Sequence, residues 1–360
     1  MVTDHNNRAE SAAKYTAIRG HDAVKSMMIE SRASGRMHHA WLLTGTAGIG
    51  KSGLARLAAA WLLSDGKGVS GLLGDDVPDF HLPPDDAGAV LALSGAHPDL
   101  MMIEPAIENN KSGQIKIEQI RALIPFMAHK PGRGGWRVAI IDTMDAVNRN
   151  GANALLKLLE EPPEKTVLFL VASRPGKLPP TVRSRCRVVR MEALRDEDCH
   201  SVLRGIWSEA DSEHLDLLVR LCAGAPGRAV SLAETGAADC YQVACALLAA
   251  PKLDMPAIVA LAGKWGRGGA DGQEMRGGAV FCLDRLLHSA ALRAAGVNTR
   301  PLCDFEKPAI EALCLRHSAT TLAAAYETFL RESGRAESLY LDFSLFLIRQ
   351  FDKLHEKSLP

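Results

Sequence analysis

The stretch Gly45-Thr-Ala-Gly-Ile-Gly-Lys51-Ser52 satisfies the pattern G-x-x-x-x-G-K-[ST] at every fixed position. The five residues before it, 40–44, form a short apolar run that predicts a buried strand. Residues 52–63 are rich in strong helix formers and predict a helix. At such a strand-to-helix junction, glycines let backbone amides surround a phosphate group, and the helix N-terminus adds its positive dipole end. The stretch therefore predicts a phosphate-binding loop, which we call the P-loop.

Each part of the P-loop has an expected role in holding ATP or ADP with Mg²⁺. The backbone amides would surround the phosphates, and Lys51 would reach the β and γ phosphates. The Ser52 hydroxyl would be a ligand of Mg²⁺. The predicted nucleotide-binding residues of the loop are Gly45, Thr46, Ala47, Gly48, Ile49, Gly50, Lys51 and Ser52.

Composition places the chain among globular proteins and limits its partners. The 360 residues are 47% hydrophobic and 23% charged, which suits two or three domains with a substantial core. The 42 Lys and Arg balance the 42 Asp and Glu, so any contact with nucleic acid has to be local. None of the eight cysteines forms a C-x-x-C pair, which argues against a disulfide framework or a thiolate zinc site.

The chain shows no sign of a membrane or secretory segment. Its first residues are polar, and no apolar run approaches the ~20 residues needed to cross a bilayer. We therefore expect a cytoplasmic protein with no membrane partner.

Strand and helix patterns alternate along the first half of the chain. The further predicted strands are residues 100–103, 136–141 and 166–172, and the helices between them are 117–127 and 148–161. This alternation predicts a doubly wound α/β domain, in which ligands lie at the carboxyl ends of the strands.

The predicted domains are an α/β nucleotide-binding domain at 1–190, a small helical lid domain at 191–245 and an all-helical domain at 250–360. Residues 64–96 are rich in Gly, Asp and Pro and predict an irregular insertion on the first domain. The glycine-rich segment 263–278 predicts a loop within the last domain.

One carboxylate, that of Asp142, lies where the Mg²⁺-binding part of a nucleotide site is expected. Asp142 ends a buried strand and could hold Mg²⁺ directly or through water. An ATPase of this architecture also needs a residue that activates water, usually a Glu immediately after that Asp. That position holds Thr143, and loss of such a base typically costs about 10²- to 10⁴-fold in rate. The sequence predicts nucleotide binding with weak or no hydrolysis, with Asp145 as the alternative base.

Arginines recur between residues 183 and 190. Arg183, Arg185 and Arg187 stand at alternate positions and would point to one side if the segment were extended. Two interpretations stay open. The arginines either protect an exposed strand edge by charge, or offer an arginine finger to the nucleotide of a neighbouring subunit.

Three blocks of sequence together resemble the bacterial clamp-loader branch of the AAA+ ATPases. They are Arg36-Met-His-His-Ala-Trp-Leu-Leu-Thr-Gly45, Asn153-Ala-Leu-Leu-Lys-Leu-Leu-Glu-Glu-Pro-Pro163 and Ser184-Arg-Cys186. A further segment, Gly224-Ala-Pro-Gly-Arg-Ala-Val-Ser-Leu232, is similar to the second sensor of the family's lid domain.

The resemblance implies a fold, site residues and partners. The fold would be an α/β P-loop (AAA+) nucleotide-binding domain with a helical lid and a C-terminal collar for oligomerisation. Asp142 would contact Mg²⁺ and nucleotide, Ser173 would be the first sensor, Arg228 the second sensor, and Arg185 the arginine finger acting in trans. The partners would be motor subunits and a clamp-opening subunit in a hetero-pentamer, a sliding clamp, and primed DNA through phosphate contacts.

Among the subunit types of this family, the chain resembles the non-motor stator. Motors carry Asp-Glu where this sequence has Asp142-Thr143. Many members also carry a four-cysteine zinc module, but residues 64–96 contain no cysteine and zinc is not predicted. The alternatives are a motor subunit that uses Asp145 or Glu160 as its carboxylate, and a P-loop small-molecule kinase.

Overall fold

The structure is a computed structural model that describes residues 18–64, 80, 82–83, 85–105, 113–132, 135–266, 270–298, 303–338 and 341–356. Two compact units divide the chain. The first comprises Met1–Ala210 with Ala223–Gly227, and the second comprises Asp211–Cys222 with Arg228–Pro360. The division into three domains stays a prediction.

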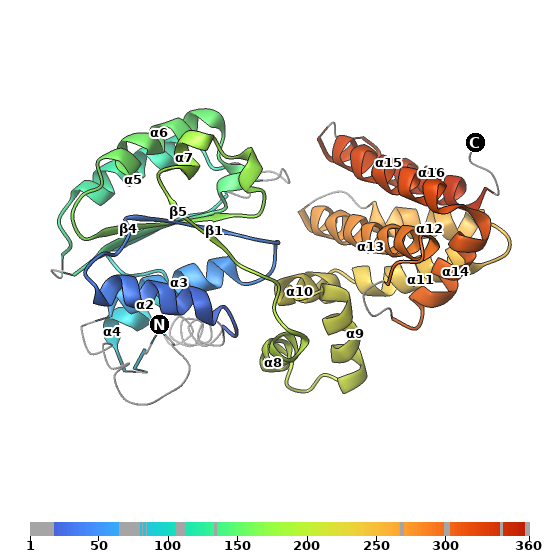
Figure 1. The fold of residues 1–360 in the computed structure, drawn as a ribbon, viewed down its shortest axis with the longest axis horizontal. Coiled ribbons are helices and arrows are strands. Elements are labelled where there is room, and N and C mark those ends of the chain that lie inside the picture. The colour runs from blue at the N-terminus through green and yellow to red at the C-terminus, as the bar shows by residue number, and fades with distance from the viewer. Residues whose placement is uncertain are drawn as a thin grey trace. The chain divides into compact units, whose positions relative to one another are not determined.

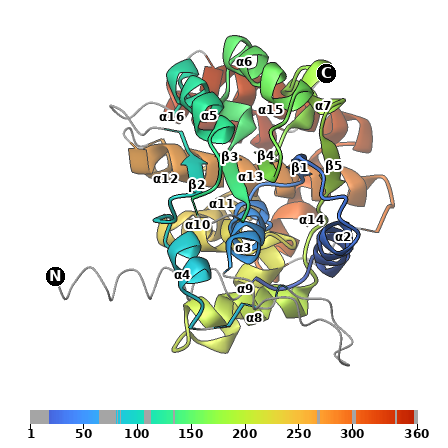
Figure 2. The ribbon, with the colours of Figure 1, turned by 90° about the vertical axis from the view of Figure 1, so that its left-hand side faces the viewer.

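A parallel sheet of five strands forms the centre of the first unit. Its strands are β1 (Ala40–Thr44), β2 (Leu100–Ile103), β3 (Arg137–Asp142), β4 (Thr166–Ala172) and β5 (Arg187–Arg190). Their order is β2-β3-β4-β1-β5, as Figure 2 shows. The predicted strands at 40–44, 100–103 and 166–172 are confirmed, and the one predicted at 136–141 begins and ends one residue later.

The strand order brings the predicted site residues to one edge of the sheet. β1 pairs with β4, with Thr44 opposite Ala172. β3 pairs with the other side of β4, with Asp142 opposite Val171. The P-loop follows β1, and Ser173 follows β4. The P-loop, Asp142 and Ser173 therefore leave neighbouring strands at the same end.

Helices cover both faces of the sheet (Figure 1). One face carries α2 (Asp22–Ala33), α3 (Lys51–Leu63) and α4 (Ala87–Leu93), and the other carries α5 (Ile117–Ala128), α6 (Arg149–Glu160) and α7 (Pro180–Arg183). Alternate residues of β1 pack into two apolar cores, one on each face of the sheet. Trp41 and Leu43 pack with α3, while Ala40 and Leu42 pack with α5 and α6. Strands buried on both faces are continuous apolar runs, which is why the sequence shows no polar alternation.

Short polar signals fix where the helices begin and end. The Asn148 side chain caps α6 by accepting a 2.8 Å hydrogen bond from the Gly151 amide, and Pro162 and Pro163 prevent the helix from continuing. Asp86 caps α4 in the same way through the amide of Ala89. The predicted irregular insertion at 64–96 therefore contains a helix that sequence reasoning missed. Residues 65–79, 81 and 84 of that segment lie outside the described residues.

The remaining described elements are helical. α8 (Asp196–Ile206) belongs to the first unit. The second unit contains α9 (Ser212–Cys222), α10 (Pro226–Glu234, from Arg228 onward), α11 (Ala237–Ala249), α12 (Met255–Trp265), α13 (Ala270–Ala294), α14 (Glu306–Arg316), α15 (Ala319–Ser338) and α16 (Phe343–His355). The predicted loop at 263–278 is wrong, because α12 and α13 include all of it except residues 266–269. Within the described ranges, no helix is long and apolar enough to cross a membrane.

A buried ion pair joins three helices of the second unit. Glu306 is fully buried, and its carboxylate accepts hydrogen bonds from Arg285 at 2.7 and 3.1 Å, from the Tyr241 hydroxyl at 2.6 Å and from the Cys303 amide at 2.7 Å. Burial alone would raise the pKa of Glu306, but hydrogen bonds and the charge of Arg285 hold that pKa below its ordinary value. The network pins α11, α13 and α14 together.

Candidate functional site

The backbone of the P-loop takes conformations that require glycine. Gly45, Gly48 and Gly50 have φ angles of 148°, 85° and 97°. A Cβ atom at Gly45 would lie 2.5 Å from the Met191 carbonyl oxygen, which is closer than real Cβ contacts allow. The glycines of the motif are therefore required by the shape of the loop.

Lys51 lies across the loop, with its side chain buried. Its Nζ donates to the carbonyl oxygens of Gly45 and Thr46, both at 2.8 Å, and to Ser173 Oγ at 3.0 Å. The structure thus brings together the lysine and the residue assigned as the first sensor, which are 122 positions apart. Ammonium and hydroxyl groups at the mouth of a P-loop can both contact a terminal phosphate.

Two residues that sequence reasoning missed hold the middle of the P-loop. The Gly227 amide donates to the Gly48 carbonyl at 2.9 Å, and a Cβ at Gly227 would come within 3.1 Å of Gly48. His21 Nε2 lies 2.8 Å from the Ile49 carbonyl oxygen. Burial lowers the pKa of His21, so the neutral ring donates this bond near pH 7. These contacts constrain the loop. Gly227 lies in the segment that resembles the second sensor, but neither it nor His21 is among the predicted site residues.

Asp142 and Ser52 have side-chain oxygens available for a cation. The Asp142 carboxylate at the end of β3 is half-buried and makes no hydrogen bond or ion pair with the described residues. The same is true of the Ser52 hydroxyl, which follows Lys51 on α3. Carboxylate and hydroxyl oxygens are ligands that Mg²⁺ accepts, so these residues fit a nucleotide bound with Mg²⁺.

The Asp145 carboxylate is hydrogen-bonded to the backbone. Its Oδ2 accepts from the Ser173 amide at 2.6 Å, and its Oδ1 accepts from the Arg174 amide at 3.0 Å. The Thr143 hydroxyl lies 3.2 Å from Asp145 Oδ2 and 3.2 Å from the Val171 carbonyl. Asp145 therefore ties the turn η1 (Met144–Ala146) to the end of β4.

The arginine segment is not extended. Residues 180–183 form the short helix α7, and only Arg187 and Arg190 lie on β5. The condition under which Arg183, Arg185 and Arg187 would point to one side is therefore not met, because two prolines at 179 and 180 start a helical turn. Arg187 is exposed on β5, which is an edge strand of the sheet, and its guanidinium lies 4.8 Å from the centre of the Trp41 ring.

Arg185 is presented at the surface by the turn after α7. Its Nη2 lies 2.7 Å from Glu160 Oε1, its Nη1 donates to the Thr181 carbonyl at 3.0 Å, and 36% of its side chain is exposed. The next residue anchors the turn: the Cys186 thiol contacts the Val182 carbonyl at 3.2 Å and packs against the core. Burial raises the pKa of Cys186 to about 12, so the thiol stays protonated.

Arg228 lies in the second compact unit. Its guanidinium is 4.1 Å from the centre of the Phe281 ring, and its Nη1 is 3.5 Å from the Cys222 carbonyl. Its role as second sensor stays a prediction.

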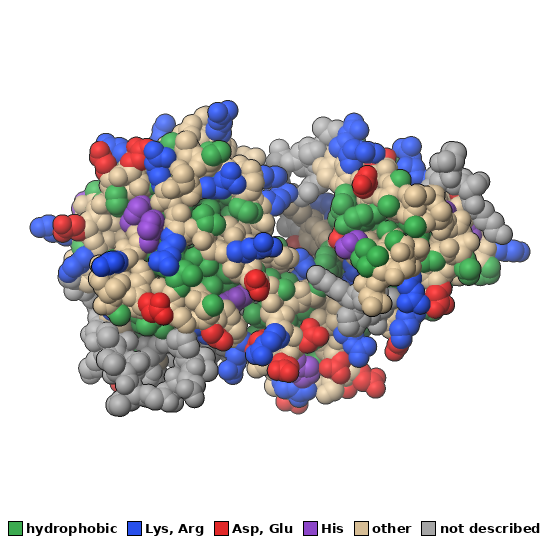
Figure 3. Space-filling model, in the orientation of Figure 1, with side chains coloured by type: hydrophobic (Ala, Val, Ile, Leu, Met, Phe, Trp, Pro, Cys, Tyr) green, Lys and Arg blue, Asp and Glu red, His purple; other side chains and the backbone are tan. Residues whose placement is uncertain are grey.

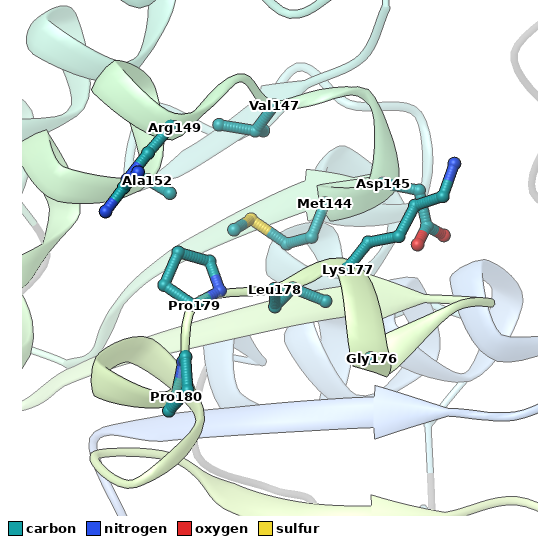
Figure 4. A pocket seen from close by; sticks show the side chains of 10 residues that line it. All are labelled: Met144, Asp145, Val147, Arg149, Ala152, Gly176, Lys177, Leu178, Pro179 and Pro180. Carbon is teal, nitrogen blue, oxygen red and sulfur yellow. The ribbon is translucent and has the colours of Figure 1, made fainter.

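A cavity of about 360 Å³ opens beside the η1 turn (Figure 4). Asp145 and Lys177 stand at one end of it and Arg149 at the other, with Met144 and Leu178 between them. No residue of the P-loop lines this cavity, and no sequence motif predicts it.

Similarity to known proteins agrees with the clamp-loader resemblance. The family described as DNA polymerase III, delta subunit, matches residues 20–195. The DNA polymerase III subunit delta' of Pseudomonas aeruginosa is 38% identical over 158 residues, which are 43% of this chain and 44% of that protein. The DNA polymerase III subunit tau of Escherichia coli is 31% identical over 234 residues, which are 62% of this chain and 33% of that protein.

This chain thus spans between a third and a half of the length of these relatives. Among solved structures, a DNA polymerase III gamma subunit-related protein from Thermotoga maritima aligns with 92% of this chain and 100% of its own, at 17% identity and a TM-score of 0.40. That score is too low to assign a fold, so the fold rests on the sheet order and the P-loop. Residues 20–195, which contain the P-loop and the five-stranded sheet, thus match the model of a DNA polymerase III subunit family, and the chain is similar to subunits of the delta' and tau types.

Proposed function

We propose that this chain is the delta-prime, or stator, subunit of the DNA polymerase III clamp loader. In this proposal it binds ATP or ADP with Mg²⁺ as a structural ligand and hydrolyses it weakly or not at all. Its own contribution to catalysis is Arg185, which completes the active site of a neighbouring motor subunit.

The observation that carries the proposal is that the carboxylates near the site contact other groups of the protein. The position after Asp142 holds Thr143, whose hydroxyl cannot take a proton from water. Asp145 has both oxygens bonded to backbone amides, and Glu160 is paired with Arg185. Each carboxylate that could replace the missing base therefore has another partner.

The P-loop supports retained nucleotide binding. Its amides and Lys51 would hold the phosphates, while Ser52 and Asp142 would hold Mg²⁺. Ser173 would contact the terminal phosphate, since it already lies 3.0 Å from Lys51 Nζ. Arg228 would be the second sensor, as the resemblance implies.

Arg185 would act by charge. A guanidinium placed against the phosphates of a neighbour stabilises the negative charge that develops during transfer, which can be worth about 10³- to 10⁵-fold in rate. Its exposed side chain and the anchored turn beneath it support this role. The subunit itself would not need to turn over nucleotide.

The proposal includes partners. They are motor subunits and a clamp-opening subunit in a hetero-pentamer of the cytoplasmic replication machinery, the sliding clamp, and primed DNA. Contacts with DNA would be a small number of phosphate contacts, because acidic and basic side chains are interspersed on the face that Figure 3 shows and the net charge is zero.

A motor subunit of the gamma/tau type is the second candidate. It is favoured by the intact P-loop and by the match to tau, which covers more of this chain than the match to delta'. The two candidates differ in whether the isolated chain hydrolyses ATP.

ATP binding and turnover by the purified chain test the proposal, with Lys51→Ala as the control. Binding that depends on Lys51, with negligible turnover, is the expected result. Robust turnover that is lost in Lys51→Ala would overturn the stator assignment in favour of the motor.

A further inference from the structure

We infer that Glu160 is a positioning residue for Arg185, holding the guanidinium in the orientation in which it meets the neighbouring subunit's nucleotide. This inference rests on the proposed function, because it needs Arg185 to act in trans. It goes beyond that proposal by assigning a role to a second residue, at the end of a different helix.

Glu160 has a rigid support. It is the last residue of α6, which is anchored to the core by the buried side chains of Leu155, Leu158 and Leu159. The Glu161 amide caps this end by donating to the Lys157 carbonyl at 3.0 Å, and Pro162 stops the helix there. The backbone of Glu160 is therefore fixed while about half of its side chain, 49%, is exposed.

Two supports from separate helices hold one guanidinium. Glu160 Oε1, at the end of α6, forms an ion pair with Nη2 at 2.7 Å, and the Thr181 carbonyl, within α7, accepts a hydrogen bond from Nη1 at 3.0 Å. A guanidinium has five N–H donors in a fixed plane, so donors remain for a phosphate beside these two contacts. A long side chain held at two points loses less freedom when it engages a ligand.

The competing explanation is an exposed ion pair with no consequence, since many such pairs contribute little. The two explanations differ in how Glu160 and Arg185 depend on each other. A positioning residue has no effect once the residue it positions is gone, whereas a residue with an independent role keeps its effect.

The experiment uses the complex reconstituted from this chain and the gamma/tau-type and clamp-opening subunits of the same genome, with ATP as the probe. Single-turnover hydrolysis is followed for wild type, Arg185→Ala, Glu160→Ala, Glu160→Gln and the double variant Glu160→Ala/Arg185→Ala. Glu161→Ala is the matched control, because Glu161 is adjacent and its side chain has no partner among the described residues. Gel filtration checks that each variant assembles.

We expect Arg185→Ala to slow hydrolysis at one site of the complex. Glu160→Ala should slow the same phase by about two- to fivefold, the worth of a good half-exposed pair, without changing ATP affinity. Glu160→Gln should slow this phase by a similar factor, because the contact with Nη2 is an ion pair and the amide carries no charge. Glu161→Ala should match wild type, and the double variant should match Arg185→Ala.

Several results would overturn the inference. One is a Glu160→Ala complex that hydrolyses ATP as fast as or faster than wild type. Another is a further loss of rate when Glu160→Ala is added to Arg185→Ala. If Arg185→Ala itself leaves every phase unchanged, the finger assignment falls and the inference with it. An effect of Arg185→Ala without one of Glu160→Ala removes the inference and leaves the proposed function intact.

Discussion

Lys51 Nζ donates a 3.0 Å hydrogen bond to Ser173 Oγ, and this contact joins the first turn of α3 to the residue after β4. It exists because β1 and β4 are neighbours in the sheet, so the chain segments that follow them leave the same edge together. The same Lys51 also bonds two carbonyls of its own loop. The P-loop lysine therefore lies between its own loop and the end of β4.

Changing Arg185 to Ala should leave ATP binding by this chain unchanged and depress ATP hydrolysis by the assembled complex. The reason is that Arg185 lies on the turn after α7, away from the P-loop in the chain, and would act on a neighbour. Steady-state hydrolysis with the motor subunits present is the measurement, and Arg190→Ala on the exposed edge strand is the control. A small-molecule kinase would be indifferent to the partner subunits, and full activity of the Arg185→Ala complex would contradict the finger.

Changing Asp145 to Ala should destabilise the first unit rather than abolish a catalytic step. The amides of Ser173 and Arg174 would each lose their acceptor, and a hydrogen bond that is not fully buried typically contributes about 1 kcal/mol. Urea unfolding gives the change in the free energy of unfolding. The motor candidate predicts the opposite pattern, in which turnover is lost while the unfolding midpoint stays where it was.

Changing Gly45 to Ala should distort the P-loop and weaken ATP binding by at least tenfold. Its φ of 148° suits glycine alone, and the new Cβ would meet the backbone oxygen of Met191 at 2.5 Å. Such backbone strain costs about 1–3 kcal/mol, and titration with ATP measures how much of this cost appears as lost affinity. Gly176→Ala is the matched control, since a Cβ there would meet nothing within 4 Å. Equal affinities for the two variants would argue against a glycine requirement at the loop.

Changing Glu306 to Gln should weaken the second unit strongly at neutral pH. The change leaves the buried charge of Arg285 without its counter-ion, and breaking a buried pair in this way costs about 3–5 kcal/mol. The measurement is urea unfolding at pH 7, and Asp304→Asn is the control because its pair with Lys307 is exposed. A loss as small as that of the control would show that the network contributes little.

Acid should weaken the wild type through the same residue. Since the pKa of Glu306 is lower in the folded chain than its ordinary value of 4.5, its contribution is complete above that pH and is lost as the pH falls through the lower folded value. Stability followed from pH 7 to pH 3 should therefore fall below about pH 4.5 in wild type and less steeply in Glu306→Gln. Parallel curves would contradict the assignment.

Local pattern was enough to predict most of the elements around the P-loop. The strands at 40–44 and 166–172 and the helix α5 follow from apolar runs and periodicity, which depend on neighbours in sequence. Prediction failed where composition outweighed periodicity. The glycines near residues 263 and 278 suggested a loop, but the packing of α12 and α13 in the second unit favours helix there.

The sequence by itself determined the P-loop, the buried strands before and after it, and the absence of a Glu after Asp142. Tertiary structure alone decided which carboxylates are available, because their partners are distant in the chain. Asp145 accepts hydrogen bonds from amides 28 and 29 positions away, and Glu160 forms an ion pair with a guanidinium 25 positions away. His21 and Gly227 likewise reach the P-loop only through folding. Such contacts are set by strand order and by where each helix ends, and neither appears in any single stretch of sequence.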